Sequence, residues 1–265
     1  MTNTDSQHRA RKRFGQNFLA DDTIIGRIAS AIAPKPGDRL VEIGPGQGAI
    51  TGPLLAYGCP LTALELDYDL VAILERKFAT EPAFQLIQGD ALKADFTALA
   101  TDTPLRVVGN LPYNISTPLI FHLLKHIAVI RDMHFMLQKE VVERMAAEAG
   151  TKVYGRLSVI VQYYCHVDYL FTVPPSAFRP APKVESAIVR LTPRSNPQPT
   201  ARNPLFFQRL VKTVFQQRRK TLRNNLKPLA EEIDLSRANI DLSLRPEALS
   251  VADFVTLAND LETSL

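Results

Sequence analysis

Short apolar runs alternate with helix-like segments from residue 38 onward, and this alternation limits the possible folds more than any other feature of the chain. It is typical of repeated βαβ units, which build an α/β domain around a mostly parallel sheet. Because the runs are almost continuously Val, Ile and Leu, we expect helices to cover both faces of that sheet. The runs are RLVEIG (39–44), LTALEL (61–66), FQLIQGD (84–90), LRVVGN (105–110) and MHFMLQ (133–138).

Two more strand-like runs follow, VDYLFTV (167–173) and ESAIVRL (185–191). The segment between them, PPSAFRPAPK, is rich in proline and predicts a long loop before a returning strand. We therefore expect a seven-stranded sheet that is mostly parallel and ends with an antiparallel strand.

The composition changes at the segment SNPQP (195–199), which is polar and proline-rich and predicts a linker. Beyond it, apolar residues recur at helical spacing from Leu205 to Phe215, and Ser250 or a neighbour is expected to cap a last helix. We predict a catalytic domain over 1–196 and a small, all-helical domain over 197–265.

The overall composition predicts a stable globular protein, since 46% of the 265 residues are hydrophobic. No apolar run is long enough to cross a membrane, and the first twenty residues contain no signal-peptide core. Cys59 and Cys165 are far apart and outside any Cys/His cluster, which argues against a disulfide scaffold or structural zinc. We expect a soluble, cytoplasmic protein that is a monomer.

The basic charge is concentrated at the two ends of the chain. Residues 186–230 contain ten Lys or Arg and no Asp or Glu, and residues 1–20 add a second basic segment. Concentrated Lys and Arg beside an acidic body are typical of a protein that binds a phosphate backbone. The alternative is that these are only solvated helix faces.

A glycine-rich turn follows the first predicted strand, in the sequence VEIGPGQGAI. Gly44, Gly46 and Gly48 allow a ligand to approach the backbone closely. Their spacing differs from the GxGxxG pattern of dinucleotide sites, and Glu42 just before the turn is unsuited to phosphate. The turn therefore favours a nucleoside without a pyrophosphate, although glycines of this kind also occur simply as turn formers.

Carboxylates follow the next two predicted strands. Glu65 is suited to accept hydrogen bonds from both ribose hydroxyls, and Asp90 could accept one from an adenine amino group. Each could instead be a helix cap or a loop carboxylate. Because the carboxyl ends of parallel strands form the ligand crevice of such a sheet, Gly44, Glu65 and Asp90 together favour a nucleoside site.

The fourth predicted strand ends in Asn110-Leu111-Pro112-Tyr113. The Asn110 amide oxygen and the following carbonyl could accept both hydrogens of an exocyclic amine, while Pro112 stiffens the turn and Tyr113 lies against a flat base. If the amine attacks a methyl sulfonium, these oxygens stabilise the positive charge that develops on nitrogen. The simpler alternative is a turn with a capping Asn.

Five segments occur in this order along the chain: RKRFGQNFL, EIGPGQGAIT, NLPYNISTPL, FRPAPKVESAIVRL and FQQRRKTLRNNL. Together they resemble the ribosomal RNA adenine dimethyltransferases that act on small-subunit rRNA. The resemblance implies a Rossmann-like class I methyltransferase fold, S-adenosyl-L-methionine as methyl donor, S-adenosyl-L-homocysteine as product and no metal. It also implies two methyl transfers to each of two adjacent adenines near the 3′ end of the rRNA, within an immature small subunit.

The resemblance further implies roles for individual residues. Tyr113 and Phe178 are expected to hold the target adenine between their rings, a use of stacking suited to a base taken out of its RNA. The donor site is expected to contain Asn17, Leu19, Gly44, Gly46, Glu65, Asp90 and Asn110. RNA phosphates are expected to bind Arg11, Lys12 and Arg13, and also Arg218, Arg219, Lys220 and Arg223, which we place close together on one helix.

Three rival functions use some of the same features. A resistance dimethyltransferase acting on large-subunit rRNA shares the strand-end motifs, but the full NLPYNISTP and QRRKTLRN strings favour the small-subunit enzyme. A DNA adenine methyltransferase is disfavoured because its fourth-strand motif usually has Pro-Pro after the Asp or Asn. A non-catalytic ribosome-assembly factor would not need an intact donor site, and neither DNA nor a membrane is expected as a partner.

Overall fold

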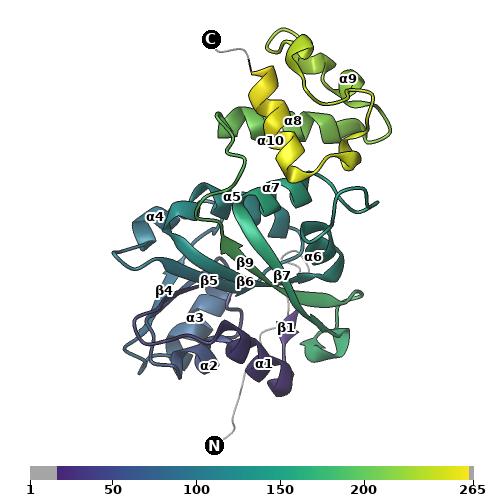
Figure 1. The fold of residues 1–265 in the computed structure, drawn as a ribbon. Coiled ribbons are helices and arrows are strands. Elements are labelled where there is room, and N and C mark those ends of the chain that lie inside the picture. The colour runs from purple at the N-terminus through teal and green to yellow at the C-terminus, as the bar shows by residue number, and fades with distance from the viewer. Residues whose placement is uncertain (1–16, 263–265) are drawn as a thin grey trace, which may run out of the picture. The chain divides into compact units, whose positions relative to one another are not determined.

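The computed structural model describes residues 17–262, which form two compact units (Figure 1). The first contains the described part of Met1–Lys139 together with Asp168–Thr192, and the second contains Glu140–Val167 and the described part of Pro193–Leu265. The second unit thus includes a segment that precedes the predicted linker. The functional division of the chain at residue 196 stays a prediction.

A seven-stranded sheet has the order β4-β3-β2-β5-β6-β9-β7. Neighbouring strands from β4 to β6 are parallel, and β9 runs antiparallel to β6, which confirms the predicted architecture. All the strand-like runs of the sequence are strands of this sheet. They are β2 (Arg39–Ile43), β3 (Leu61–Glu65), β4 (Phe84–Gln88), β5 (Leu105–Asn110), β6 (Ile130–Gln138), β7 (Cys165–Val173) and β9 (Ser186–Pro193).

Helices of the first unit lie on both faces of the sheet. Figure 1 shows α4 (Phe96–Leu99) and α5 (Ser116–Lys125) on the opposite face from α1 (Asp22–Ile32), α2 (Thr51–Leu55) and α3 (Tyr68–Lys77). Every residue of β3 is buried, whereas β4 at the sheet edge is only partly buried. Side chains from both faces of the inner strands are thus removed from water, which explains their continuous apolar sequences.

A second, two-stranded sheet joins distant parts of the chain. In it, β1 (Phe18–Leu19) pairs antiparallel with β8 (Phe178–Arg179), so that Leu19 is the partner of Phe178. Both residues are buried in the core cluster that also contains Ile25 and Ile28 of α1. Asp21 caps α1, since its carboxylate accepts a hydrogen bond from the backbone of Ile24 at 3.0 Å.

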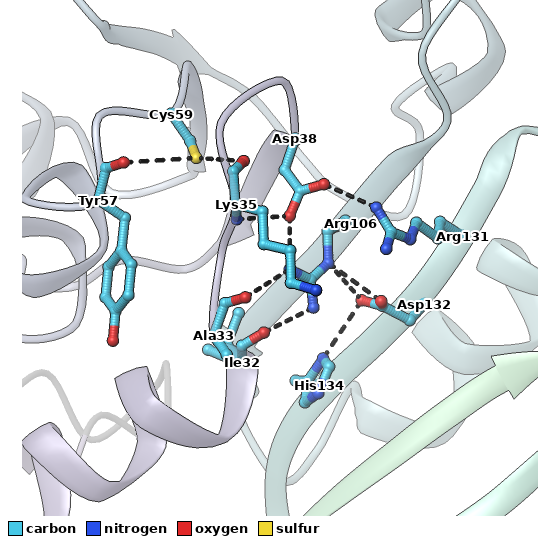
Figure 2. A network of polar contacts seen from close by, with 10 residues as sticks. All are labelled: Ile32, Ala33, Lys35, Asp38, Tyr57, Cys59, Arg106, Arg131, Asp132 and His134. Carbon is cyan, nitrogen blue, oxygen red and sulfur yellow. Dashed lines mark hydrogen bonds and ion pairs between the residues drawn. The ribbon is translucent and has the colours of Figure 1, made fainter.

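The amino ends of the strands are joined by a buried ion network around Arg106 of β5 (Figure 2). Its guanidinium donates to Asp132 of β6 at 3.0 Å, to Asp38 at 2.7 Å and to the carbonyl of Ile32 at 2.6 Å. Burial alone would raise the pKa of Asp38, but the Lys35 backbone N–H and Arg106 outweigh it and hold that pKa below its usual value. The sequence offered no sign of this network.

The second unit is mostly helical; it also contains the first residues of β7 and an isolated β-bridge between Ile233 and Glu262. Its core contains Phe207 and Val211 of α8 (Pro204–Val214) and Phe254 of α10 (Val251–Leu261), all fully buried. The predicted cap of the last helix is confirmed, because Ser250 Oγ accepts a hydrogen bond from the backbone of Asp253 at 3.1 Å. The other helices are α6 (Lys139–Met145), α7 (Arg156–Tyr164) and the short α9 (Leu222–Asn225).

Candidate active site

A cavity of about 230 Å³ opens at the carboxyl ends of β2, β3, β4 and β5. The parallel register places these ends together, since Ile43 of β2 is the partner of Leu64 of β3, and Leu64 is the partner of Ile87 of β4. The structure therefore brings together most of the predicted donor and catalytic residues. The cavity is lined by Asn17, Leu19, Gly44, Gly46, Glu65, Asp90, Asn110, Leu111, Pro112 and Tyr113, among others.

The glycine turn after β2 forms one wall of the cavity. Gly44 and Gly46 have φ angles of 64° and 59°, in the left-handed region that favours glycine. A Cβ atom on Gly46 would also lie 3.2 Å from the ring of Phe18, so the turn and β1 approach each other closely. This turn presents backbone atoms to a ligand where side chains would fill the space.

Glu65 at the end of β3 is fixed by backbone groups. One carboxylate oxygen accepts hydrogen bonds from Leu66 and Asp67, both at 2.9 Å, and the other accepts one from Gly46 at 3.3 Å. Burial raises the pKa of Glu65 and the three backbone N–H groups oppose that rise. A carboxylate has about four acceptor positions, so this one can still accept a bond from a ligand hydroxyl.

Glu42 of β2 also lines the cavity. The sequence indicated only that this residue is unsuited to binding phosphate. Thr51 Oγ1 donates to Glu42 Oε2 at 2.6 Å. Burial raises the pKa of Glu42 to about 7, with a smaller rise from the charge of Glu65. Lys77 opposes that rise from α3, where its Nζ donates to the carbonyl of Gln47 at 2.8 Å. The cavity therefore contains a carboxyl that titrates near neutral pH.

Asp90 follows β4 and begins a turn. Its Oδ1 accepts a hydrogen bond from the backbone of Leu92 at 2.9 Å, and its backbone carbonyl accepts one from Lys93 at 2.9 Å. The carboxylate is thereby oriented by the turn that follows it, and its second oxygen is available as an acceptor. Its hydrogen bond with an amino group of a bound base stays a prediction.

The Asn110 side chain is oriented by Asn17, the residue just before β1. Its Nδ2 donates to the backbone carbonyl of Asn17 at 3.2 Å, so its Oδ1 is the atom that can accept from a ligand in the cavity. Gly109 makes this strand end possible, because a Cβ there would lie 2.5 Å from the carbonyl oxygen of Ile43. The amide of Asn110 thus presents an acceptor to the cavity.

Tyr113 is half-buried at the edge of the cavity, and both its hydroxyl and its backbone carbonyl form hydrogen bonds. Its hydroxyl shares a hydrogen bond with Ser186 Oγ at 2.7 Å, and its carbonyl accepts one from Ser116 Oγ at 3.1 Å. Ser186 is the first residue of β9 and is fully buried. Ser186 was not among the predicted site residues, although it lies in the segment FRPAPKVESAIVRL.

Phe178 lies in the hydrophobic core, whereas a stacking role would require its ring to reach the cavity. Its ring is 1% exposed, belongs to the hydrophobic core and does not line the cavity. It is connected to the cavity through β1, because its strand partner Leu19 is a lining residue. Its contact with a base stays a prediction.

The predicted basic residues of the second unit are exposed, but they do not share a helix. Arg218, Arg219 and Lys220 form a turn after a 3-10 helix (Phe215–Gln217), and only Arg223 is helical, on α9. The helix prediction is wrong because the Asn225 side chain donates to the carbonyls of Gln217 and Lys220, each at 3.2 Å, and Thr221 begins a new helix. Arg11, Lys12 and Arg13 lie outside the described residues.

Arg218 also has a partner within its unit. Its guanidinium donates to the carbonyl of Tyr154 at 2.7 Å. A guanidinium has five N–H donors, so this bond leaves others for a phosphate.

Across residues 17–262, none of the helices is both long and apolar enough to span a bilayer.

Known proteins resemble this chain over nearly its whole length. "Ribosomal RNA small subunit methyltransferase A" of Pseudomonas aeruginosa is 60% identical over 256 residues, covering 96% of each chain. The protein of the same name from Saccharophagus degradans is 60% identical over 263 residues, covering 98% of each.

Solved structures agree with the predicted methyltransferase fold. The crystal structure of a dimethyladenosine transferase from Plasmodium falciparum has a TM-score of 0.75 and 27% identity, covering 91% of this chain and 95% of that one. The 23S rRNA methyltransferase ErmE has a TM-score of 0.70 and 23% identity, covering 92% and 99%, and shares the fold. Residues 7–263 match the family described as "Ribosomal RNA adenine dimethylase". The chain therefore belongs to the ribosomal RNA adenine dimethylase family.

Proposed function

We propose that this protein transfers methyl groups from S-adenosyl-L-methionine to N6 of two adjacent adenines near the 3′ end of small-subunit rRNA. The products are N6,N6-dimethyladenosine and S-adenosyl-L-homocysteine. Membership of the adenine dimethylase family and the small-subunit name of the relatives at 60% identity support this reaction and substrate. The orientation of Asn110 is the structural observation that carries the proposal, because it leaves an amide oxygen to accept from an amine.

The cavity fits a methionine nucleoside. Backbone groups of the turn at Gly44 and Gly46 line it where a side chain would obstruct a ligand, and Glu65 is held as an acceptor for ribose hydroxyls. Asp90 keeps one oxygen for the adenine amino group of the donor, and Asn17 and Leu19 close the side formed by β1. When bound, the donor supplies a methyl group on a positively charged sulfur.

Asn110 and Leu111 select and hold the attacking amine in this mechanism. The Asn110 Oδ1 and the Leu111 carbonyl accept its two hydrogens, which turns the nitrogen lone pair toward the methyl group. Positive charge develops on N6 as the new bond forms, and the two oxygens stabilise it more strongly than they stabilise the neutral amine. The methylated nitrogen then loses a proton to water, so the chain needs no general base.

The second transfer uses the same two residues with one hydrogen fewer. The monomethylated amine has a single N–H, so one oxygen loses its partner while the base must still be aligned. Tyr113, at the edge of the cavity, holds the base by stacking in our proposal. Phe178 reaches the opposite face of the base only if the residues that now cover its ring move.

RNA binding is assigned to the basic residues of both ends. Arg219, Lys220 and Arg223 are exposed on the turn and on α9, where they can contact phosphates. Arg11, Lys12 and Arg13 are proposed to act with them. The substrate in this proposal is an immature small subunit in the cytoplasm, and the protein acts on it as a monomer.

The proposal is tested with small subunits isolated from cells that lack this methylation. Incubation with radiolabelled S-adenosyl-L-methionine should label them and leave mature small subunits, large subunits and DNA unlabelled. Mass mapping of the labelled rRNA should locate dimethyladenosine at two adjacent positions near the 3′ end. Label in the large subunit would instead support a resistance methyltransferase.

A further inference from the structure

The Tyr113 hydroxyl faces the protein interior. Its partner, Ser186 Oγ, lies 2.7 Å away and belongs to a fully buried residue. A phenol that forms this bond directs only its ring toward the cavity. The hydroxyl is therefore an anchor for the ring and takes no part in recognising the base.

The rest of Tyr113 is fixed by its own loop. Ser116, itself 2% exposed, donates to the Tyr113 carbonyl, and Ile115 N–H donates to the Pro112 carbonyl at 3.1 Å. Because the hydroxyl oxygen lies on the axis about which χ2 rotates, holding the backbone and the hydroxyl fixes χ1 and with it the position of the ring. The position of the ring is therefore set by the protein before any base arrives.

The position of Ser186 is itself fixed by the sheet. It is the strand partner of Gln138, the last residue of β6. The next residues tie the same end of this strand pair: Lys139 N–H donates to the Glu185 carbonyl at 3.0 Å, and Lys139 Nζ pairs with the Glu185 carboxylate at 2.9 Å. Because Ser186 is fixed in the central sheet, its hydrogen bond fixes the Tyr113 hydroxyl relative to that sheet.

We infer that Ser186 is a positioning residue for the second methylation, because it holds the Tyr113 ring in the position against which the target base stacks. The inference rests on the proposed function. In the first transfer two N–H bonds also align the base, whereas in the second only one remains, so ring position contributes more to the alignment. Small errors of alignment can slow a transfer strongly.

The test compares Ser186→Ala, Tyr113→Phe and the double variant in single-turnover methylation of undermethylated small subunits. Each single variant should slow the second transfer about tenfold and the first far less, so that monomethyladenosine accumulates and is detected by mass spectrometry. The double variant should be no slower than either single one, since both remove the same hydrogen bond. The affinity for S-adenosyl-L-methionine should not change.

Two controls separate positioning from stability. Ser158→Ala removes another fully buried serine, one that donates to the Arg144 carbonyl in the second unit, and should leave the product ratio unchanged. Ser186→Thr keeps a hydroxyl at the site and should restore most of the second transfer. If Ser186→Ala does not fold, Tyr113→Phe alone decides the question.

Failure of this inference can be told apart from failure of the proposed function. If Tyr113→Ala blocks transfer while Tyr113→Phe and Ser186→Ala keep the normal product ratio, the positioning role is overturned and the stacking role stands. If Tyr113→Ala also methylates normally, Tyr113 does not hold the base, and the stacking and positioning roles are both overturned while the dimethyltransferase function stands. Wild-type protein that leaves undermethylated small subunits unlabelled would overturn the proposed function itself.

Discussion

Buried carboxylates lie at both ends of the central sheet, and they are held in opposite ways. At the amino end, Asp38 and Asp132 are paired with Arg106, and their pKa values are lowered despite burial. At the carboxyl end, Glu42 and Glu65 have hydroxyl and backbone partners but, among residues 17–262, no guanidinium partner, and burial raises their pKa values.

This difference suggests that the carboxylates at the amino end of the sheet stabilise the fold, whereas those at the carboxyl end bind a ligand. A carboxylate that is already neutralised has little to offer a ligand, whereas one buried without a strong counter-charge is stabilised by a cation that enters its cavity. S-adenosyl-L-methionine carries positive charge on its sulfur and its amino group. We therefore expect substitutions at the amino end to affect folding and those at the carboxyl end to affect methyl transfer.

The largest effect is expected for Arg106→Met. It leaves Asp38 and Asp132 buried without their common partner, which should lower the free energy of unfolding by about 3–5 kcal/mol in urea titrations at pH 7. Because the folded-state pKa values of both carboxyls are lowered, the stability they contribute is present above pH 4 and is lost as pH falls through those values, so the deficit should shrink in acid.

Arg131→Met is the matched control for that substitution. Arg131 also contacts Asp38, at 2.7 Å, but its side chain is 53% exposed. An exposed pair contributes about 1 kcal/mol or less, so the control should be nearly neutral. Equal losses in the two variants would contradict the view that the buried network holds the amino end.

At the carboxyl end, Asn110→Ala should slow methyl transfer by about 10²–10³-fold, because it removes an oxygen that stabilises the charge on the amine. Donor binding should also weaken. Its unfolding transition should change by only about 1 kcal/mol, since one partly exposed hydrogen bond is lost. Normal single-turnover rates would overturn the proposed mechanism. A large loss of stability would contradict the expectation that substitutions at the carboxyl end of the sheet affect methyl transfer and not folding.

Glu42→Gln tests how a carboxyl that is buried without a guanidinium partner in the described part of the chain affects the pH dependence of stability. The folded-state pKa of about 7 exceeds the ordinary 4.5, so the stability that Glu42 contributes is fully present below pH 4.5 and is lost as pH rises through 7. The variant should therefore be more stable than wild type at pH 8, by on the order of 3 kcal/mol, with little difference at pH 4.5. Thermal unfolding across this range measures it, and identical pH profiles would contradict it.

The smallest effect is expected at Ala33, just after α1, whose φ of 43° lies in the left-handed region. Ala33→Gly should relieve this strain, and after the entropic cost of glycine the gain should be about 0.5 kcal/mol. Ala31→Gly, still within α1, should instead lose about as much or more. Loss of stability in both variants would show that Ala33 is not strained.

The sequence predicted the carboxyl end of the sheet better than the amino end. Polar residues that end apolar runs are visible locally, and parallel pairing then brings Gly44, Glu65 and Asp90 to one edge. Arg106, in contrast, lies inside an apolar run, and its partners Asp38 and Asp132 are 68 and 26 residues away. Nothing near Arg106 in the chain indicates that they will meet.

Long-range pairing and a side-chain contact also affect two other predictions. Phe178 was expected to stack on the target base; pairing of β8 with β1 places it in the core, and its contact with a base stays a prediction. The basic segment was expected on one helix, but the Asn225 side chain holds a turn within it. Thr221, a preferred N-cap residue, was the one available sign that a new helix begins there.

The pairing of β1 with β8 also has a consequence for the order in which the protein is made. Translation produces Phe18 and Leu19 early, whereas their strand partners Arg179 and Phe178 emerge only after most of the central sheet. The Asn17 carbonyl that orients Asn110 lies beside this strand pair. A nascent chain that has not yet reached residue 179 cannot form this strand pair, so we expect the cavity that we propose for the methyl donor to be completed, and donor binding to appear, only late in synthesis.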